Sequence, residues 1–276
     1  MGVSAVDLQS FGWSVAVKVI AVANQKGGVG KTTTSVNLAA ALAAMEKRVL
    51  LVDLDPQGNA TVSVGLNKGD LNATAFELMV EQQPLSDVVT PLETFGLHCV
   101  PADGDLTAAE VALLSVDDRE QRLKAALAAG ASVYDFVIID CPPSLNMLTL
   151  NALVAADSVL ITMQCEYFAL EGLSALMETI NTVRQTVNPS LRIEGILRTL
   201  YDPRNALTNE VSEQLHQHFE GLVYRTVIPR NVKLAEAPSH GLPGIVYDRL
   251  SRGATAYMAL AGEFMRRQEQ HQKESL

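Results

Sequence analysis

The sequence has little of what marks a secreted or membrane protein. Of its 276 residues only 3 are cysteines, and these are far apart, odd in number and in no CxxC pair. This pattern excludes a disulfide framework and a zinc site, so we expect Cys99, Cys141 and Cys165 to be buried free thiols in a reduced, cytoplasmic protein. No apolar run reaches the roughly 18 residues of a transmembrane helix. The first 17 residues lack the basic and apolar regions of a secretory signal.

The chain also lacks a basic excess. Its formal net charge is −10, which by itself argues against a nucleic-acid binder. The charge is uneven, however, because residues 1–150 hold 9 basic and 17 acidic side chains. A local basic patch in the second half is compatible with these counts.

Aromatic residues are scarce at 5%, whereas 48% of the chain is hydrophobic, most of it Ala, Leu and Val. Short apolar runs rich in β-branched residues alternate with segments of helical spacing, which predicts a mainly parallel, twisted sheet with helices on both faces. We expect one domain over residues 18–267, a variable extension over 1–17 and a polar tail over 268–276. The expected strands cover residues 17–23, 48–53, 97–100, 135–140, 158–163, 191–197 and 222–228, and the clearest helical stretches cover 32–45 and 105–129.

A glycine-rich loop connects the first expected strand to the first expected helix. Residues 26–33 read Lys-Gly-Gly-Val-Gly-Lys-Thr-Thr, and backbone N–H groups of such a loop can wrap a phosphate chain at a helix N-terminus. Lys31 is placed to contact the β- and γ-phosphates and Thr32 to bind Mg²⁺. The standard pattern G-x-x-x-x-G-K-[ST] is not met, because Gln25 replaces its first glycine and Lys26 adds a second lysine.

Two further acidic sites follow strands. Asp53 and Asp55 close the second strand, and Asp140 closes the strand at 135–140. Because the carboxyl ends of parallel strands meet at one edge of a sheet, we expect these carboxylates near the glycine loop. One can hold a water bound to Mg²⁺ and another can orient the attacking water.

These motifs resemble the ParA/MinD-type P-loop ATPases. Residues 26–34 are similar to their deviant Walker A motif, 53–60 to their second motif and 137–144 to their Walker B region. Residues 164–172 and 228–241 resemble the chromosomal ParA (Soj) branch in particular. The resemblance covers roughly residues 18–265.

The resemblance implies a role for each matching residue. Lys26 would reach across a dimer to the partner's nucleotide, Lys31 would bind phosphate, and Asp55 would position the water. Asp140 and Thr32 would serve Mg²⁺, and Pro229 and Asn231 would contact adenine. The predicted nucleotide-binding residues are Lys26, Gly27, Gly28, Val29, Gly30, Lys31, Thr32, Thr33, Pro229 and Asn231.

Proteins of this family form a homodimer across ATP, bind double-stranded DNA without sequence preference and hydrolyse ATP slowly. A ParB-type (Spo0J-like) centromere-binding protein stimulates hydrolysis and releases the dimer. The resemblance therefore implies a chromosome or plasmid partition ATPase that is associated with the nucleoid. The candidate DNA contacts are Arg204, Arg230 and Lys233, followed by Arg198, Arg225 and Arg249.

Other members of the same fold remain as alternatives. A MinD-like membrane switch needs a basic amphipathic C-terminal helix, whereas we expect Tyr257, Leu260, Phe264 and Met265 to pack in the core. A nitrogenase-iron-protein-like carrier needs paired cysteines, and a metabolic amide or biotin-pathway ligase would not need the Soj-like segments. We expect no N-terminal helix-turn-helix domain, because about 17 residues precede the first strand.

Overall fold

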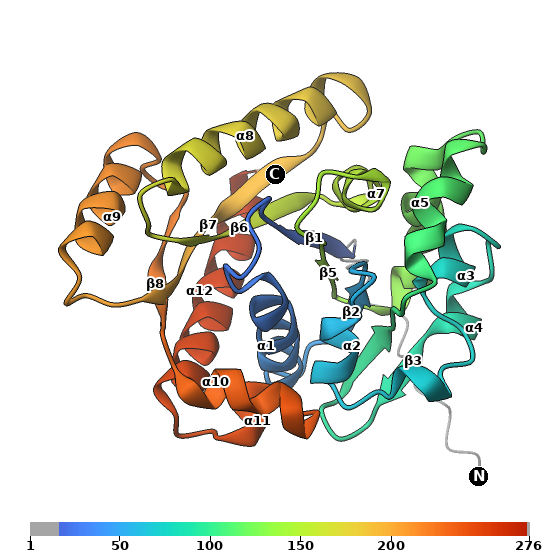
Figure 1. Ribbon diagram of the computed structural model, residues 1–276, viewed down its shortest axis with the longest axis horizontal. Helices are drawn as coiled ribbons and strands as arrows, with labels where there is room; N and C mark the ends of the chain where they lie inside the picture. Colours follow the sequence, from blue (N-terminus) through green and yellow to red (C-terminus); the bar gives the residue numbers. More distant parts are fainter. Residues whose placement is uncertain (1–16, 275–276) are drawn as a thin grey trace, which may run out of the picture.

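The centre of the molecule is one sheet of eight strands in the order β3-β4-β2-β5-β1-β6-β7-β8 (Figure 1). The computed structural model describes residues 17–274, so all of the predicted N-terminal extension except Val17 lies outside the described residues. Neighbouring strands run parallel, except that β3 is antiparallel to β4. The strands are β1 (Lys18–Ala23), β2 (Val49–Asp53), β3 (Thr90–Leu92), β4 (Leu97–Val100), β5 (Phe136–Asp140), β6 (Ser158–Gln164), β7 (Arg192–Tyr201) and β8 (Val223–Pro229).

Helices cover both faces of this sheet, as predicted, and each face has its own apolar core. Figure 1 shows α1 and α12 on one side of the sheet and α7 and α8 on the other. The first core includes α1 (Lys31–Ala44), α2 (Asn59–Ser63), α10 (Val232–Glu236), α11 (Gly244–Tyr247) and α12 (Arg252–Glu274). The second includes α3 (Ala75–Met79), α4 (Leu85–Val88), α5 (Leu106–Leu114), α6 (Arg122–Gly130), α7 (Met147–Ala155), α8 (Ala169–Thr186) and α9 (Ala206–His218).

The central strands form because their residues are apolar on both faces. Every residue of β2 and β5 is buried, which is typical of parallel strands covered by helices on both sides. The seven strands predicted from the sequence are confirmed, with ends that differ by a few residues. The three-residue edge strand β3 was not predicted, because Pro91 and its flanking residues carry no strand pattern.

The helical stretch predicted over residues 105–129 is wrong as one helix. The structure divides it into α5 and α6, with a turn and the short 3₁₀ helix Arg119–Gln121 between them. Asp118 has a φ of 54°, a left-handed conformation that a helix cannot contain. Apolar residues at helical spacing continue on both sides of the turn, so the sequence pattern does not show that the helix is interrupted there.

Helix α12 packs against the sheet through the C-terminal apolar stripe. Tyr257, Leu260 and Phe264 are buried, and Met265 packs beside them. The Phe264 ring lies against Phe136 of β5 with its centroid 5.4 Å away. The predicted core role of this stripe is therefore confirmed. The helix continues past residue 267, where a polar tail was predicted to begin, and ends at Glu274.

Candidate functional site

The glycine loop lies between the carboxyl end of β1 and the start of α1. Gly28 and Gly30 have φ values of +73° and +80°, which glycine adopts without steric cost. A Cβ atom built on Gly27 or Gly28 would meet nothing within 4 Å, so the loop faces open space. From below, the Thr199 hydroxyl donates a hydrogen bond of 2.7 Å to the Val29 carbonyl. The loop is thus held in shape on the side that faces Thr199 of β7, whereas the side of Gly27 and Gly28 is open.

Lys31 is the first residue of α1, and its ammonium group lies inside the loop. Its Nζ donates to the Lys26 carbonyl at 3.2 Å. Burial lowers the pKa of Lys31, and the charges of Asp140 and Asp55 partly oppose this shift. A partly desolvated ammonium group at the N-terminus of a helix, inside a glycine loop, is a favourable site for an anion.

The acidic residues predicted to converge do so because their strands are neighbours. Asp53 and Asp140 are register partners at the ends of β2 and β5. Asp53 is fully buried, and its carboxylate accepts bonds from the Thr61 amide and hydroxyl, both at 2.8 Å, and from the Asp55 amide at 3.1 Å. Asp53 therefore shapes the turn that carries Asp55, whereas Asp55 lines the open cleft.

One carboxylate oxygen of Asp140 lacks a hydrogen-bond partner within residues 17–274. Its Oδ1 accepts from the Ser35 hydroxyl at 2.8 Å, whereas its buried Oδ2 accepts no hydrogen bond. Burial raises the pKa of Asp140, and the neighbouring Asp53 raises it further. A nearby cation would offset both costs, so the residues present fit Mg²⁺.

The residues described contain no group of three or more His, Cys, Asp or Glu side chains that could hold a metal alone. A cation here would therefore need Thr32, water and ligand oxygens in addition to Asp140.

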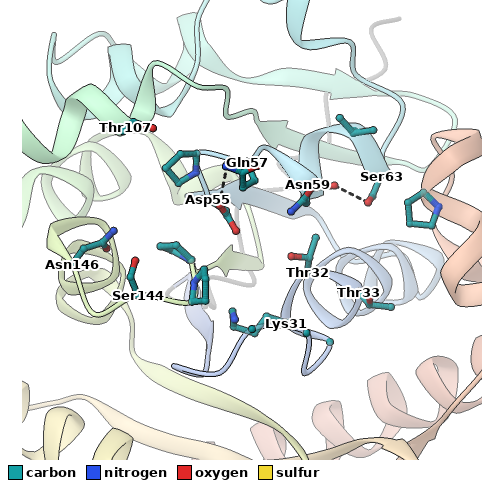
Figure 2. A pocket seen from close by; sticks show the side chains of 18 of the residues that line it. Lys31, Thr32, Thr33, Asp55, Gln57, Asn59, Ser63, Thr107, Ser144 and Asn146 are labelled. Atoms are coloured by element: carbon teal, nitrogen blue, oxygen red, sulfur yellow. Dashed lines mark hydrogen bonds between the residues drawn. The ribbon is translucent and has the colours of Figure 1, made fainter.

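A cleft of about 790 Å³ opens above the loop (Figure 2). In Figure 2 Lys31, Thr32 and Asp55 surround one open space from the loop and from the end of β2. The far wall is formed by α2, α5 and the segment after β5; the motifs at residues 53–60 and 137–144 supply part of it, whereas the residues from α5 lie outside every predicted motif. The additional lining residues are Pro56, Gln57, Asn59, Val62, Ser63, Thr107, Glu110, Pro142, Pro143, Ser144, Asn146, Leu200 and Pro238.

A second cavity of about 100 Å³ adjoins the cleft and contains Pro229 and Asn231. It shares Gly30, Thr33 and Leu200 with the larger cleft. The Asn231 Oδ1 caps α10 by accepting from the Leu234 amide at 3.2 Å. The structure therefore places both predicted adenine contacts beside the glycine loop, although they follow that loop by about 200 residues in the sequence.

Lys26 and Val29 do not line the cleft. The Val29 side chain is buried below the loop. The Lys26 ammonium points to the segment after β6, where it forms an ion pair with Glu166. Nothing in the local sequence indicates that Lys26 and Glu166 form a pair.

Two of the six arginine and lysine candidates, Arg204 and Arg230, lie close enough for both to act on Asp202. Arg204 is exposed and binds both carboxylate oxygens of Asp202. This bond lowers the pKa of Asp202 to about 2, with a smaller contribution from the charge of Arg230. Lys233 follows in α10 and pairs with Glu236 at 2.8 Å.

Arg198 is wrong as a surface candidate. It is buried, and its guanidinium donates to the Ser212 hydroxyl at 2.7 Å and to the Tyr224 carbonyl at 2.8 Å. Arg225 and Arg249 are exposed.

Two residues of the site were not predicted: Thr199, which contacts the loop, and Ser35, which contacts the Asp140 carboxylate. Ser35 could have been found, because it lies one helical turn after Lys31 and so shares its face of α1. Thr199 could not, because only the register of β7 brings it below Val29.

Known proteins with similar sequences share these motifs. Residues 17–193 match the family described as "AAA domain". The chromosome partitioning protein ParA of Myxococcus xanthus is 51% identical over 256 residues, which cover 93% of this chain and 90% of that protein. The sporulation initiation inhibitor protein Soj of Bacillus subtilis is 52% identical over 246 residues, 89% of this chain and 97% of that one.

Solved structures agree on the fold. A Mycobacterium smegmatis protein described as cobyrinic acid a,c-diamide synthase, with bound ATP analogue and magnesium, is 39% identical with a TM-score of 0.81 and covers 92% of this chain and 96% of that chain. The cell division ATPase MinD of Pyrococcus furiosus is 24% identical with a TM-score of 0.74 over 90% of this chain and 98% of that chain, and this likeness supports the fold alone. The ParA and Soj relatives are about half identical to this chain, and the match covers nine-tenths or more of each of them. The chain therefore belongs to the ParA/Soj family of chromosome-partitioning P-loop ATPases.

Proposed function

We propose that this chain is an ATP-hydrolysing DNA-partition protein that dimerises across ATP, binds DNA without sequence preference and is released on hydrolysis. The observation that carries the proposal is that Lys31 and Asp55 line one cleft beside a glycine loop of the phosphate-binding type, with the buried Asp140 close enough for its charge to act on Lys31. The solved relative that holds an ATP analogue and magnesium supports the choice of ligand.

In this proposal the open cleft receives the triphosphate and the smaller cavity receives the base. The N–H groups of residues 27–33 and the Lys31 ammonium bind the phosphates, and Pro229 and Asn231 contact the adenine. Thr32 and Asp140 hold Mg²⁺, which neutralises phosphate charge when bound. The Asp55 carboxylate lies in the cleft at the end of β2 and orients the attacking water.

The proposed dimer follows from Lys26. Its ammonium lies outside the cleft of its own chain, so it cannot serve that chain's phosphates without moving. On a second copy facing the same cleft, Lys26 would supply positive charge to the partner's nucleotide. Loss of the γ-phosphate would then weaken the contact between the two copies.

The proposed DNA surface contains Arg204, Arg230 and Lys233, on the side of the second cavity. A dimer doubles this surface, and affinity for a polyanion rises steeply with the number of phosphate contacts. A ParB-type partner that stimulates hydrolysis would act on the same dimer, and binding to DNA would place the protein on the nucleoid.

The test compares wild type with Asp55→Asn and Lys31→Ala. We expect Asp55→Asn to bind ATP with wild-type affinity in calorimetry and to release phosphate at least about 100-fold more slowly, because removing a group that acts on the transition state costs about 3 kcal/mol. Lys31→Ala should lose ATP binding as well. The exposed Asp117→Asn is the matched control. Undiminished phosphate release by Asp55→Asn would refute the proposed role of Asp55 in hydrolysis.

Duplex DNA of unrelated sequences tests the remainder of the proposal. The wild-type chain should bind each duplex with similar affinity in the presence of ATP and Mg²⁺, and more weakly with ADP. Equal binding with ATP, with ADP and without nucleotide would contradict the proposed cycle.

A further inference from the structure

Hydrogen bonds hold the backbone of Lys26 in place, and an ion pair holds its side chain. Its amide donates to the Asn24 Oδ1 at 2.9 Å, and its carbonyl accepts from the Lys31 Nζ. Its ammonium pairs with Glu166, which follows 140 residues later, and the two side chains are 49% and 43% exposed. Such an exposed pair is weak enough to be exchanged.

Two exposed aromatic side chains follow Glu166 directly. Tyr167 is 76% exposed and Phe168 69% exposed, and their rings meet edge to face with centroids 5.0 Å apart. Every other large hydrophobic side chain that is exposed within residues 17–274 is aliphatic. Exposed neighbouring aromatics on a chain with few of them indicate an interaction surface.

The segment that carries this pair, residues 165–168, is held in place. The Glu166 carbonyl accepts from the Ala169 amide at 3.0 Å, and the Glu166 amide donates to the Gln164 carbonyl at 2.9 Å. The Cys165 carbonyl accepts from the Thr208 hydroxyl of α9 at 3.4 Å. The aromatic pair is therefore presented on a preformed turn, which lowers the entropic cost of binding.

We propose that a second copy of this chain covers Tyr167 and Phe168, and that Glu166 withholds Lys26 from the partner's nucleotide until it does. This inference rests on the proposed dimer. Continuity identifies the occupant, because Glu166 joins the aromatic pair directly to Lys26, whose proposed target lies on the second copy. In a two-fold dimer each copy contributes this surface once.

Charge gives the exchange its direction. In the monomer one carboxylate neutralises Lys26. In the dimer the triphosphate of the partner carries more negative charge than Glu166 and so attracts the ammonium more strongly. A diphosphate competes less well, so the Lys26–Glu166 pair favours the monomer after hydrolysis. Glu166 acts here as a positioning residue, because it acts through Lys26.

The experiment measures the dimer dissociation constant by analytical ultracentrifugation with Mg²⁺ and a non-hydrolysable ATP analogue. Glu166→Gln removes the Lys26 ion pair from each of the two monomers, so dimerisation no longer has to break two such pairs and should tighten about 3- to 30-fold. Phe168→Ser should weaken it at least about tenfold. The matched controls are Glu178→Gln on the exposed face of α8 and Leu250→Ser at a residue that is 92% exposed, and both should behave as wild type.

The outcomes separate this inference from the proposed function. A wild-type chain that stays monomeric overturns the proposed dimer and this inference together. A wild type that dimerises while Glu166→Gln is unchanged or weaker overturns only the role of Glu166, and unchanged dimerisation of Phe168→Ser overturns the aromatic surface. ADP affinity and circular dichroism establish that each variant is folded. A dimer that also tightens about 3- to 30-fold with ADP in Glu166→Gln supports the exchange.

Discussion

At the scale of single residues, the loop depends on contacts from distant segments as much as on its glycines. The Thr199 hydroxyl is buried and bonds to the Val29 carbonyl. Its neighbour Leu200 has a φ of 49° and lines both cavities. A non-glycine residue in this region is strained, and the strain lies where the nucleotide is proposed to bind.

Thr199→Val tests the support from below. Valine has nearly the same shape but cannot donate, so the Val29 carbonyl is left without its partner. We expect a loss of about 1–3 kcal/mol of unfolding free energy, measured by urea denaturation, and weaker ATP binding in calorimetry. Thr186→Val, at an exposed hydroxyl on α8, should change stability by less than about 0.5 kcal/mol. Wild-type stability and affinity of Thr199→Val would show that the hydroxyl does not support the loop.

At the scale of elements, the edge strand β8 is shaped by side chains on both sides. Its register against β7 shifts between Ile196 and Arg198. On one side of β8, Arg198 donates to the carbonyls of Tyr224 and Arg225. On the other side Glu263 of α12 accepts from the Arg225 and Thr226 amides, both at 2.8 Å, and from the Thr226 hydroxyl at 2.7 Å. The carboxylate thus satisfies edge N–H groups that another strand could otherwise bind.

Glu263→Gln should therefore destabilise the chain in a pH-dependent manner. Burial opposes ionisation of Glu263, but bonds from Thr226 and Arg225 outweigh it and lower its pKa below the ordinary 4.5. A lowered pKa stabilises the fold above the ordinary value, and this contribution disappears as pH falls through the lowered one. We expect a cost of about 2–3 kcal/mol at pH 7.

Urea denaturation at pH 7 and at successively lower pH checks this expectation. The difference between wild type and Glu263→Gln should shrink below pH 4.5. The exposed Glu269→Gln on the same helix is the control. A difference that is independent of pH would mean that amide packing, and not charge, sets the cost.

At the scale of the whole molecule, net charge and proposed ligand oppose each other. A chain of charge −10 repels DNA at long range. Only a local surface can overcome this, and Arg204 and Arg230 lie close enough for both to act on Asp202. Within the part of the chain that the structure describes, none of the helices combines the length and apolar character that crossing a bilayer requires.

Salt dependence of DNA binding tests this surface. With ATP and Mg²⁺, Arg204→Ala should weaken binding to unrelated duplexes alike and reduce the slope of log K against log salt by about 0.9 for each phosphate that the protein no longer neutralises. In a dimer both copies carry the substitution, so the slope should change by about twice that amount. Fluorescence anisotropy between about 50 and 200 mM salt measures the slope. Arg184→Ala on α8 is the control, and an equal effect there would remove Arg204 from the surface.

The sheet, the glycine loop and the positions of Asp55 and Asp140 could all be predicted from the amino acids alone. Parallel strands bring their carboxyl ends to one edge, so a motif that follows a strand has its place in space as soon as the topology is known. Lys31, Thr32 and Asp55 could therefore be placed without coordinates. Pro229 and Asn231 came from the family resemblance, not from the spacing.

Which of the remaining polar residues act together became clear only from the packing of the folded chain. Glu166 meets Lys26 and Thr199 meets Val29 across 140 and 170 residues, and Arg198 is buried while Arg204 is exposed. Glu166 follows β6 and Thr199 belongs to β7, so the order of the strands in the sheet brings both to the segment after β1, and that order leaves no local signal. Packing between distant segments sets the burial and partners of a side chain, whereas local sequence sets only its type and its place along an element.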